Sequence, residues 1–489
     1  MKSKRFIAAV LGLTMLLAVF GVPVQAREKD AVCDCGEVLQ VWVDGFGQKL
    51  YFNEGTPRQK DAPILVTDKL GEGLKWLLLG GALAARYDDP RPLTGGLGQL
   101  VEALFGHLAL DTNGNSVAPV SCNWVIREGQ VKNHARWPEF TFRYDYRMDP
   151  MDSAQELNAF IEALCEKTGH DKIALTGHSQ GSSVVMAYIA AHGTKRLDTL
   201  IISNGGWRGL AMAGQLFNRE IKLDPAAITA FIANSDNGSG TLTAAMDMLR
   251  LSGLLDFIPE LADGLDSSML ESLFVNHLRP IFCHMPSIWT FIPQESLETA
   301  LKLLLDHPEY DGLKAKIYRY RKEVFLKAPD LLRQAKADGV KVAVIAAYGP
   351  APVPVTKDTS YLCDSLIDTA SMSGGATTAA MGTTLPPGKP KYRSPDNMVD
   401  AATCVLPDQT WFIKGNVHDE EASQALRLWI IHSEKTPDVF ANPDFPQYLQ
   451  RTRDGKSAVP LTGNEPARVP PETMGAAAKD FAKSIFSFN

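Results

Sequence analysis

Short apolar runs bounded by turn residues recur along the chain, and this pattern predicts buried β-strands. Two of the runs end in distinctive turns. The run 38–43 stops at Asp44-Gly45-Phe46-Gly47, and the run 172–176 leads into Gly177-His178-Ser179-Gln180-Gly181. The predicted strands are 38–43, 140–145, 172–176, 199–203, 340–347 and 410–413. We expect the run 410–413 to be the last strand.

Helical patterns lie between these runs. Leu157, Phe160 and Leu164 repeat at helical spacing, and small and apolar residues fill 182–191. A third helical pattern, 421–432, closes the domain. A strand–helix–strand succession requires parallel strands joined by right-handed crossovers. The pattern therefore predicts an α/β fold with a mostly parallel central sheet and helices on both faces.

Other stretches break this alternation and divide the chain into parts. The parts are a leader at 1–26, a first core part at 27–206 with a helical insertion at about 56–136, a helical cap at 207–335, a second core part at 336–436, and a partly disordered C-terminal extension at 437–489. A block of helices between two strands of the sheet is expected to cover the face that carries the active site.

Two apolar helical segments have alternative interpretations. The segment 74–85 is apolar on nearly all sides but too short to span a bilayer, and we interpret it as a buried helix rather than one that docks on lipid. Within the predicted cap, Met246, Leu249, Gly253 and Phe257 form one stripe. The stripe fits either the core of the cap or a lid that contacts lipid, and we favour the core.

The first residues have the pattern of a secretory signal peptide. Three basic residues precede an apolar run that ends in Val24-Gln25-Ala26, which predicts cleavage after Ala26 and export, with an uncleaved anchor as the alternative. The net charge is −7, and removal of residues 1–26 makes it −10. Nucleic-acid binding needs a basic face, so this balance argues against a nucleic-acid partner.

Seven cysteines occur in the chain, and an odd number leaves at least one thiol unpaired. Cys363 and Cys404 are the first expectation for a disulfide, because the bond would staple the loop before the last predicted strand. The only close pair is Cys33-x-Cys35, which does not have the usual spacing of a zinc site. The sequence thus implies no metal and no organic cofactor.

The pentapeptide 177–181 matches G-x-S-x-G between a predicted strand and a predicted helix, which is the context of a nucleophile elbow. Ser179 is therefore the candidate nucleophile. The plainer alternative is a glycine-rich turn in which the serine caps the helix. The turn at 44–47 follows an early strand, where hydrolases of this type place an oxyanion donor, so the N–H groups of Phe46 and Gln180 are the candidate oxyanion hole.

A serine nucleophile needs an imidazole base and a carboxylate that orients it. In this fold the order is Ser, Asp or Glu, then His. His418 follows the last predicted strand and is the candidate base. Asp396 is the preferred acid and Asp400 the next choice. Asp364 and Asp368 are weaker alternatives.

Several motifs in this order resemble the lecithin–cholesterol acyltransferase family of α/β-hydrolases, which includes lysosomal phospholipases and phospholipid:diacylglycerol acyltransferases. The motifs are Val43-Asp44-Gly45-Phe46, Tyr144-Asp145-Tyr146-Arg147 followed by Asp149-Pro150, the elbow 177–181, Gly205-Gly206-Trp207-Arg208-Gly209, Pro286-Ser287 with Pro293, and Tyr348-Gly349 with the prolines after it. Together they span about 38–432. The resemblance implies an α/β-hydrolase fold, acyl-ester chemistry on lipids, and Ser179, Asp396 and His418 as the triad.

The chain departs from the family pattern at three places. Gln180 replaces an apolar residue, Tyr146 replaces tryptophan, and 396–399 is a loose version of the family's acid motif. We predict an exported serine esterase or lipase of the phospholipase–acyltransferase type, with transient contact to a membrane surface through the cap. The alternatives are a small-ester carboxylesterase or serine peptidase on the same fold, and a catalytically inactive binding protein.

Overall fold

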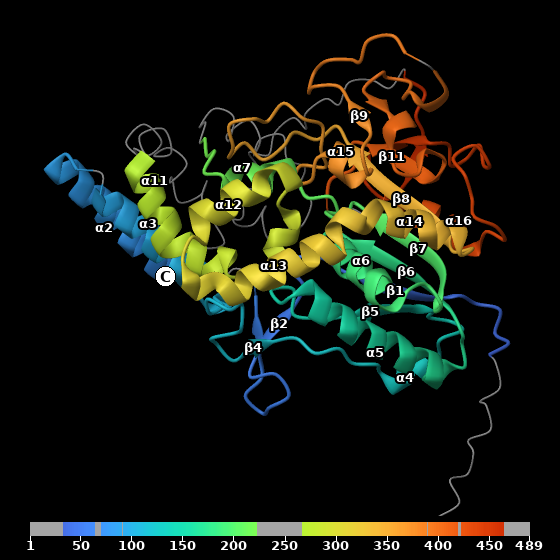
Figure 1. Ribbon diagram of the computed structural model, residues 1–489, viewed down its shortest axis with the longest axis horizontal. Coiled ribbons are helices and arrows are strands. Elements are labelled where there is room, and N and C mark those ends of the chain that lie inside the picture. The colour runs from blue at the N-terminus through green and yellow to red at the C-terminus, as the bar shows by residue number, and fades with distance from the viewer. Residues whose placement is uncertain are drawn as a thin grey trace, which may run out of the picture.

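The computed structural model describes residues 33–63, 70–89, 91–222, 267–388, 390–418 and 422–463. At its centre is an eight-stranded sheet in the order β13-β12-β11-β8-β7-β6-β1-β5 (Figure 1). Its strands are β1 (Leu39–Val43), β5 (Glu139–Phe142), β6 (Ile173–His178), β7 (Leu197–Ser203), β8 (Lys341–Tyr348), β11 (Thr410–Lys414), β12 (Tyr448–Arg451) and β13 (Ala458–Pro460). All neighbours are parallel except β12 and β13. The predicted α/β fold with a mostly parallel sheet is confirmed.

Helices cover both faces of this sheet because successive strand residues point to opposite sides. Val342 and Val344 of β8 join the larger core under α5 (Pro150–Thr168), α6 (Gly181–His192) and α14 (Ala328–Ala337). On the other face, the intervening residues Ala343 and Ile345 pack into the core that contains α16 (Gln424–His432). Every residue of β8 is buried, as in a central parallel strand.

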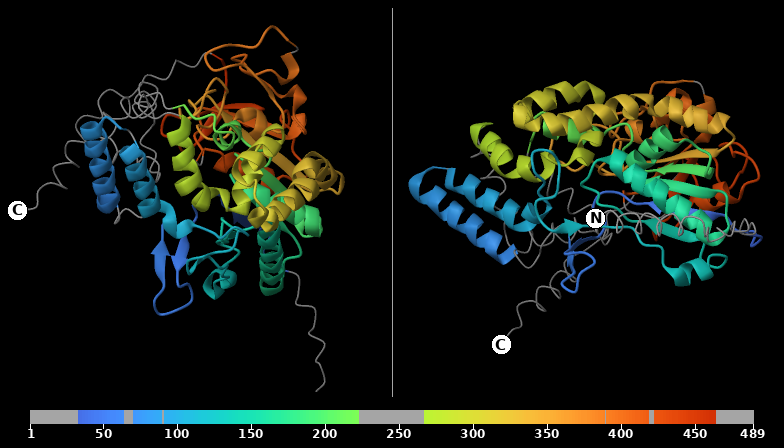
Figure 2. Two further views of the ribbon diagram at one scale, coloured as in Figure 1. Left: turned by 60° about the vertical axis from the view of Figure 1, so that its left-hand side comes forward. Right: turned by 60° about the horizontal axis from the view of Figure 1, so that its bottom comes forward.

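The insertion after β1 has helices of its own. The helices α2 (Leu70–Tyr87) and α3 (Arg91–Phe105) pack as a hairpin, and β2 (Leu50–Phe52), β3 (Lys60–Ala62) and β4 (Val120–Ser121) form a small separate sheet. The hairpin lies at one end of the molecule in all three views (Figures 1 and 2).

The interpretation of 74–85 as a buried helix is wrong for one face of α2. Leu77 is buried against α3, but the side chains of Trp76 and Leu79 are 46% and 48% exposed. A hairpin of two helices can bury only the facing stripe of each, so Trp76 and Leu79, which lie on another face of α2, stay in contact with solvent. None of the helices among the described residues is long and apolar enough to cross a membrane.

The described part of the predicted cap is helical. It contains α7 (Ala211–Phe217), α11 (Ser267–Leu273), α12 (Leu297–Leu304) and α13 (Asp311–Glu323), and its last helix, α14, packs on α6 and β8. The stripe of Met246, Leu249, Gly253 and Phe257 lies outside the described residues, as does the leader 1–26.

The sheet continues beyond the strand that was expected to be the last one. β12 pairs with β11 in parallel and β13 turns back on β12, so part of the expected C-terminal extension completes the sheet. Tyr448 shows why: its ring stacks on Phe412 of β11 with centroids 5.2 Å apart. The other short α-helices and strands of the described residues are α4 (Glu128–Lys132), α15 (Thr369–Met372), β9 (Thr377–Thr378) and β10 (Val399–Asp400).

Candidate active site

Ser179 occupies a sharp turn between β6 and α6. Its φ is +52°, a left-handed conformation that costs energy for a residue with a side chain and that is characteristic of a nucleophile elbow. The glycines on either side permit this turn. A Cβ on Gly177 would lie 2.8 Å from the Ser182 Cα, and one on Gly181 would overlap the Val43 carbonyl oxygen. The elbow therefore needs small residues at both positions.

Ser179, His418 and Asp364 form a continuous hydrogen-bonded relay. The Ser179 Oγ lies 2.8 Å from the His418 Nε2, and the His418 Nδ1 lies 2.6 Å from the Asp364 Oδ2. Asp364 is fully buried, whereas Ser179 and His418 are each 8% exposed. The geometry brings the predicted nucleophile and the predicted base together, 239 residues apart in sequence. It is the arrangement that a serine–histidine–aspartate triad requires.

The other oxygen of Asp364 is held by the backbone. The Leu366 and Ile367 N–H groups donate to the Asp364 Oδ1 at 3.0 and 2.8 Å. Each carboxylate oxygen thus has its own donors, two amides on one side and the imidazole on the other. This fixes the rotamer of Asp364 and, through it, the orientation of the His418 ring.

The relay of Ser179, His418 and Asp364 lies at the carboxyl ends of three parallel strands of the central sheet. Ser179 directly follows β6, Asp364 lies in the long loop after β8, and His418 follows β11. Open α/β sheets bind ligands at this edge. His178 packs beside the relay with its ring centroid 5.2 Å from that of His418, so it is a neighbour of the base.

Asp396, the preferred acid of the sequence analysis, is not the carboxylate beside His418. Its Oδ2 is 2.9 Å from the Lys414 Nζ and accepts a hydrogen bond of 3.0 Å from the Tyr348 hydroxyl. Burial raises the pKa of Asp396, but hydrogen bonds from Ser394 and Lys414 outweigh it and leave the pKa below its usual value. Asp396 therefore links the ends of β8 and β11 through its contacts with Tyr348 and Lys414. Asp364, and not Asp396, is the carboxylate that contacts His418.

The remaining acid candidates also have other partners. Asp400 pairs with Arg393 at 3.1 Å and caps the turn 401–403. Asp368 caps α15 and accepts the Ala211 N–H at 2.7 Å. Asp364 obeys the same chain order as Asp396. No local signal separates the candidates, because the carboxylates of Asp396, Asp400 and Asp368 also accept backbone N–H groups from residues two or three positions later.

The candidate oxyanion donors lie at the ends of two adjacent strands, β1 and β6. An added Cβ on Gly45 would lie 2.6 Å from the Ser179 Oγ and 3.0 Å from the Gln180 nitrogen, so the turn after β1 lies directly against the elbow. Neither the Phe46 nor the Gln180 N–H donates a hydrogen bond to another described residue. Their role as an oxyanion hole stays a prediction that this proximity supports.

The side chain of Gln180 explains one departure from the family pattern. It is fully buried, and its Nε2 donates to the Tyr146 carbonyl at 3.0 Å. The Tyr146 ring meets that of Phe46 edge-on, with centroids 4.6 Å apart. Arg147, also fully buried, pairs with Asp145 at 2.6 Å and stiffens the same loop. Gln180 thus ties the elbow to a rigid loop that also contacts the oxyanion turn.

Gly45→Ala is expected to lower kcat/KM by at least about a hundredfold, the effect of losing one oxyanion donor. The added methyl overlaps the Ser179 Cβ and pushes the turn away from the elbow. Gly129→Ala is a suitable control, because an added Cβ there has nothing within 4 Å. Steady-state kinetics on a nitrophenyl ester measures the difference, and equal activities would remove Gly45 from the site.

All seven cysteines have free thiols, so the expected Cys363–Cys404 disulfide is wrong. The Cys363 Sγ lies 3.4 Å from the Pro350 carbonyl oxygen, next to the triad acid, whereas Cys404 ends the turn 401–403. Burial raises the pKa of the Cys404 thiol to about 12, and that of Cys363 also rises. Neither thiol is suited to ionise.

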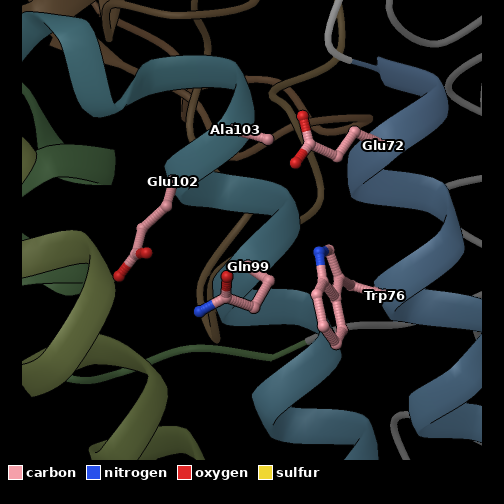
Figure 3. Close-up of a pocket in the computed structure, with 5 residues that line it drawn as sticks. All are labelled: Glu72, Trp76, Gln99, Glu102 and Ala103. Carbon is pink, nitrogen blue, oxygen red and sulfur yellow. The ribbon is translucent and has the colours of Figure 1, made fainter.

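A shallow hollow lies on the α2–α3 hairpin (Figure 3). Glu72 and Trp76 line it from α2, and Gln99, Glu102 and Ala103 from α3. The Glu102 carboxylate is engaged by the His277 Nδ1 at 2.8 Å. None of the five lining residues belongs to the relay of Ser179, His418 and Asp364.

A family model described as the alpha/beta hydrolase fold matches residues 127–257, which include the elbow. Together with the sheet order and the position of Ser179, this match identifies the α/β-hydrolase fold. It is a match to the broad fold and not to the lecithin–cholesterol acyltransferase-like family that the sequence motifs resemble. No curated protein matches the chain.

Two solved structures are similar to the chain at low levels. One, described as the Tle4–Tli4 complex, is 13% identical over 80% of this chain and 96% of that chain, with a TM-score of 0.29. The other, a putative aryl esterase from Burkholderia cenocepacia, is 14% identical over 63% and 93% of the two chains, with a TM-score of 0.16. The assignment of the fold does not depend on either of them.

Proposed function

We propose that the protein is a serine hydrolase that cleaves esters through an acyl-enzyme. The observation that carries this proposal is the relay from Ser179 through His418 to Asp364, with the serine on a strained elbow. Buried structural serines do not need a histidine at hydrogen-bonding distance that is itself oriented by a fully buried carboxylate. The relay supports an active enzyme over a catalytically inactive binding protein.

The proposed reaction begins when the Ser179 Oγ attacks the ester carbonyl carbon while the His418 Nε2 takes its proton. Asp364 stabilises the resulting imidazolium through the Nδ1 hydrogen bond. The Phe46 and Gln180 N–H groups donate to the developing oxyanion. Collapse of the tetrahedral intermediate breaks the ester bond, and His418 passes the proton to the leaving alcohol. Water or an acceptor alcohol, deprotonated by His418, then attacks the acyl carbon. The bond between the acyl carbon and the Ser179 Oγ breaks as His418 returns the proton to Ser179.

For the substrate we propose a lipid ester. Support comes from the motifs shared in order with lipid-acting acyltransferases and phospholipases, and from the apolar side chains that the α2–α3 hairpin presents to solvent. Trp76 and Leu79 are each about half exposed on one face of α2. Tryptophan beside aliphatic residues on a helix surface favours the boundary between lipid and water. The leader-like pattern of 1–26 extends the proposal to an enzyme that acts after export.

A panel of substrates tests the lipid proposal. We expect faster turnover of phospholipid or triglyceride dispersed in vesicles or emulsion than of short nitrophenyl esters or peptides. Trp76→Ser is expected to lower the rate on vesicles severalfold and to leave the rate on a soluble ester unchanged. Trp76 belongs to α2, in the hairpin at one end of the molecule, whereas Ser179 and His418 follow β6 and β11 of the central sheet. Trp137→Ser, at an exposed tryptophan outside the α2–α3 hairpin, is the control.

Each outcome of the panel is informative. A preference for soluble short esters with no gain at an interface would replace the lipid proposal by a carboxylesterase. Cleavage of peptides alone would indicate a serine peptidase. A fluorophosphonate probe tests whether the protein is a serine hydrolase at all. An intact protein that does not react at Ser179 would be a binding protein.

A further inference from the structure

We propose that Cys33, Cys35, His134 and His170 form a structural Zn²⁺ site. The four side chains come from three separate parts of the chain, yet one ligand atom of each lies within 4.8 Å of the other three. The Cys33 Sγ is 3.2 Å from the His134 Nε2, and the Cys35 Sγ is 3.5 Å from the His170 Nε2. Two thiolates and two imidazoles are a ligand set that suits Zn²⁺.

The spacing of these atoms agrees with a tetrahedral ion. Zn–S bonds of about 2.3 Å and Zn–N bonds of about 2.0 Å at tetrahedral angles separate sulfur from nitrogen by about 3.5 Å and the two sulfurs by about 3.8 Å. The observed sulfur–nitrogen distances are 3.2 and 3.5 Å. Small changes of rotamer would therefore complete the coordination, and four protein ligands would leave no open position.

Both imidazoles already have the orientation of metal ligands. The His134 Nδ1 lies 2.7 Å from the Val131 carbonyl oxygen, and the His170 Nδ1 lies 3.3 Å from the Thr168 carbonyl oxygen. A proton on each Nδ1 satisfies these carbonyls and leaves the Nε2 lone pair directed at the cysteines. Metal-binding histidines are typically held in this way by their second nitrogen.

The place of the cluster in the fold explains what the ion would do. Cys33 and Cys35 precede β1, His134 precedes β5 and His170 precedes β6, and these three strands are neighbours in the order β6-β1-β5. The Cys33 N–H also donates to the Gly169 carbonyl at 2.9 Å. A shared ion would clamp the three entering segments at the amino edge of the sheet. Ser179 leaves β6 at the opposite edge, so the site is structural.

Export presents a competing fate for the same cysteines, because an oxidising compartment permits a Cys33–Cys35 disulfide. The positions of the histidines favour a metal site over a disulfide. A Cys33–Cys35 disulfide does not require imidazole ligands, yet the His134 and His170 Nε2 atoms both lie beside the sulfurs. All four residues are partly buried, which shields the thiols while leaving a path for an ion.

The test uses the full chain, purified without chelator, and measures metal by mass spectrometry. We expect about one zinc per chain, as for a closed four-ligand site, and little zinc in Cys33→Ser and His134→Ala. Cys165→Ala and His307→Ala, at a buried cysteine and an exposed histidine outside the cluster, should retain it. Replacement of zinc by Co²⁺ should give thiolate charge-transfer absorption in the unmodified protein, and Cys33→Ser and His134→Ala should lack this absorption.

Two further measurements keep the result clear if a variant fails to fold. In the unmodified protein, Cys33 and Cys35 should react with an alkylating reagent only after chelation of the metal, and chelation should lower Tm. Reaction of Ser179 with a fluorophosphonate should persist at a temperature well below that Tm, which separates this site from the proposed hydrolase activity. A Cys33–Cys35 disulfide in metal-free protein, or full zinc content in both ligand variants, would overturn the proposal.

Discussion

Ser179→Ala is expected to lower kcat for ester hydrolysis by about a millionfold, close to the loss seen when a whole triad is removed. The hydroxyl oxygen is the atom that forms the acyl-enzyme, and no neighbouring group replaces it: the Ser182 hydroxyl donates instead to the Ser179 carbonyl at 2.6 Å. The fold should survive, because alanine retains the Cβ and removes only one oxygen. Burst-phase kinetics and labelling by a fluorophosphonate probe measure the loss.

Ser183→Ala is the matched control for this prediction. Ser183 lies on the same helix and is fully buried, and its hydroxyl has no hydrogen-bond partner among the described residues. We expect the control to retain nearly full activity and labelling. If the Ser179→Ala protein still hydrolysed esters at more than a few per cent of the original rate, the nucleophile would be elsewhere and the proposed mechanism would fail.

The elbow and its base could be predicted from the sequence because their signals are local. The strand–turn–helix pattern around Ser179 requires only adjacent residues, and His418 lies a few residues after a strand with a clear apolar run. Both features are read without knowing which segments meet. The order of serine and histidine along the chain then supports the pairing of Ser179 with His418.

The acid could not be chosen in this way because its identity depends on a contact between two loops. Asp364 and Asp396 both follow β8 and precede β11, so chain order admits both. The choice is made by the path of the long loop after β8, which folds back over the strand ends. The same reason hid the grouping of two cysteines with two histidines: Cys33 and His134 are 101 residues apart, and Cys35 and His170 are 135 apart.

Compositional expectations failed where packing decided the structure. The stretch after 437 is rich in proline and polar residues. Tyr448 and Leu449 nevertheless pack into the cores beside the sheet, and β12 pairs with β11 as a further strand. Apolar content alone suggested that 74–85 is buried, but a two-helix hairpin at the end of the molecule has too few neighbours to cover it. In both cases the sequence does not reveal which other part of the chain packs against the segment.

Asp364→Asn is expected to lower kcat by about ten-thousandfold with little effect on folding, through the tautomer of His418. Asp364 accepts two backbone N–H groups on Oδ1 and the His418 Nδ1 proton on Oδ2. Asparagine has one acceptor oxygen, which the backbone donors would retain, so its NH₂ group would face the His418 Nδ1. The Nδ1 would then have to accept, and the Nε2 proton would block acceptance of the Ser179 proton.

Asp396→Asn is the contrasting variant and should lose stability rather than catalysis. Its ion pair with Lys414 weakens, so Tm should fall while kcat stays near that of the unmodified enzyme. Because the pKa of Asp396 is lowered in the fold, its contribution is present at neutral pH and is lost as pH falls through that lowered pKa. The difference in Tm between Asp396→Asn and the unmodified protein should therefore shrink on acidification. Loss of kcat in Asp396→Asn with an active Asp364→Asn would reverse the assignment, and thermal melts beside single-turnover kinetics on both variants measure the two effects separately.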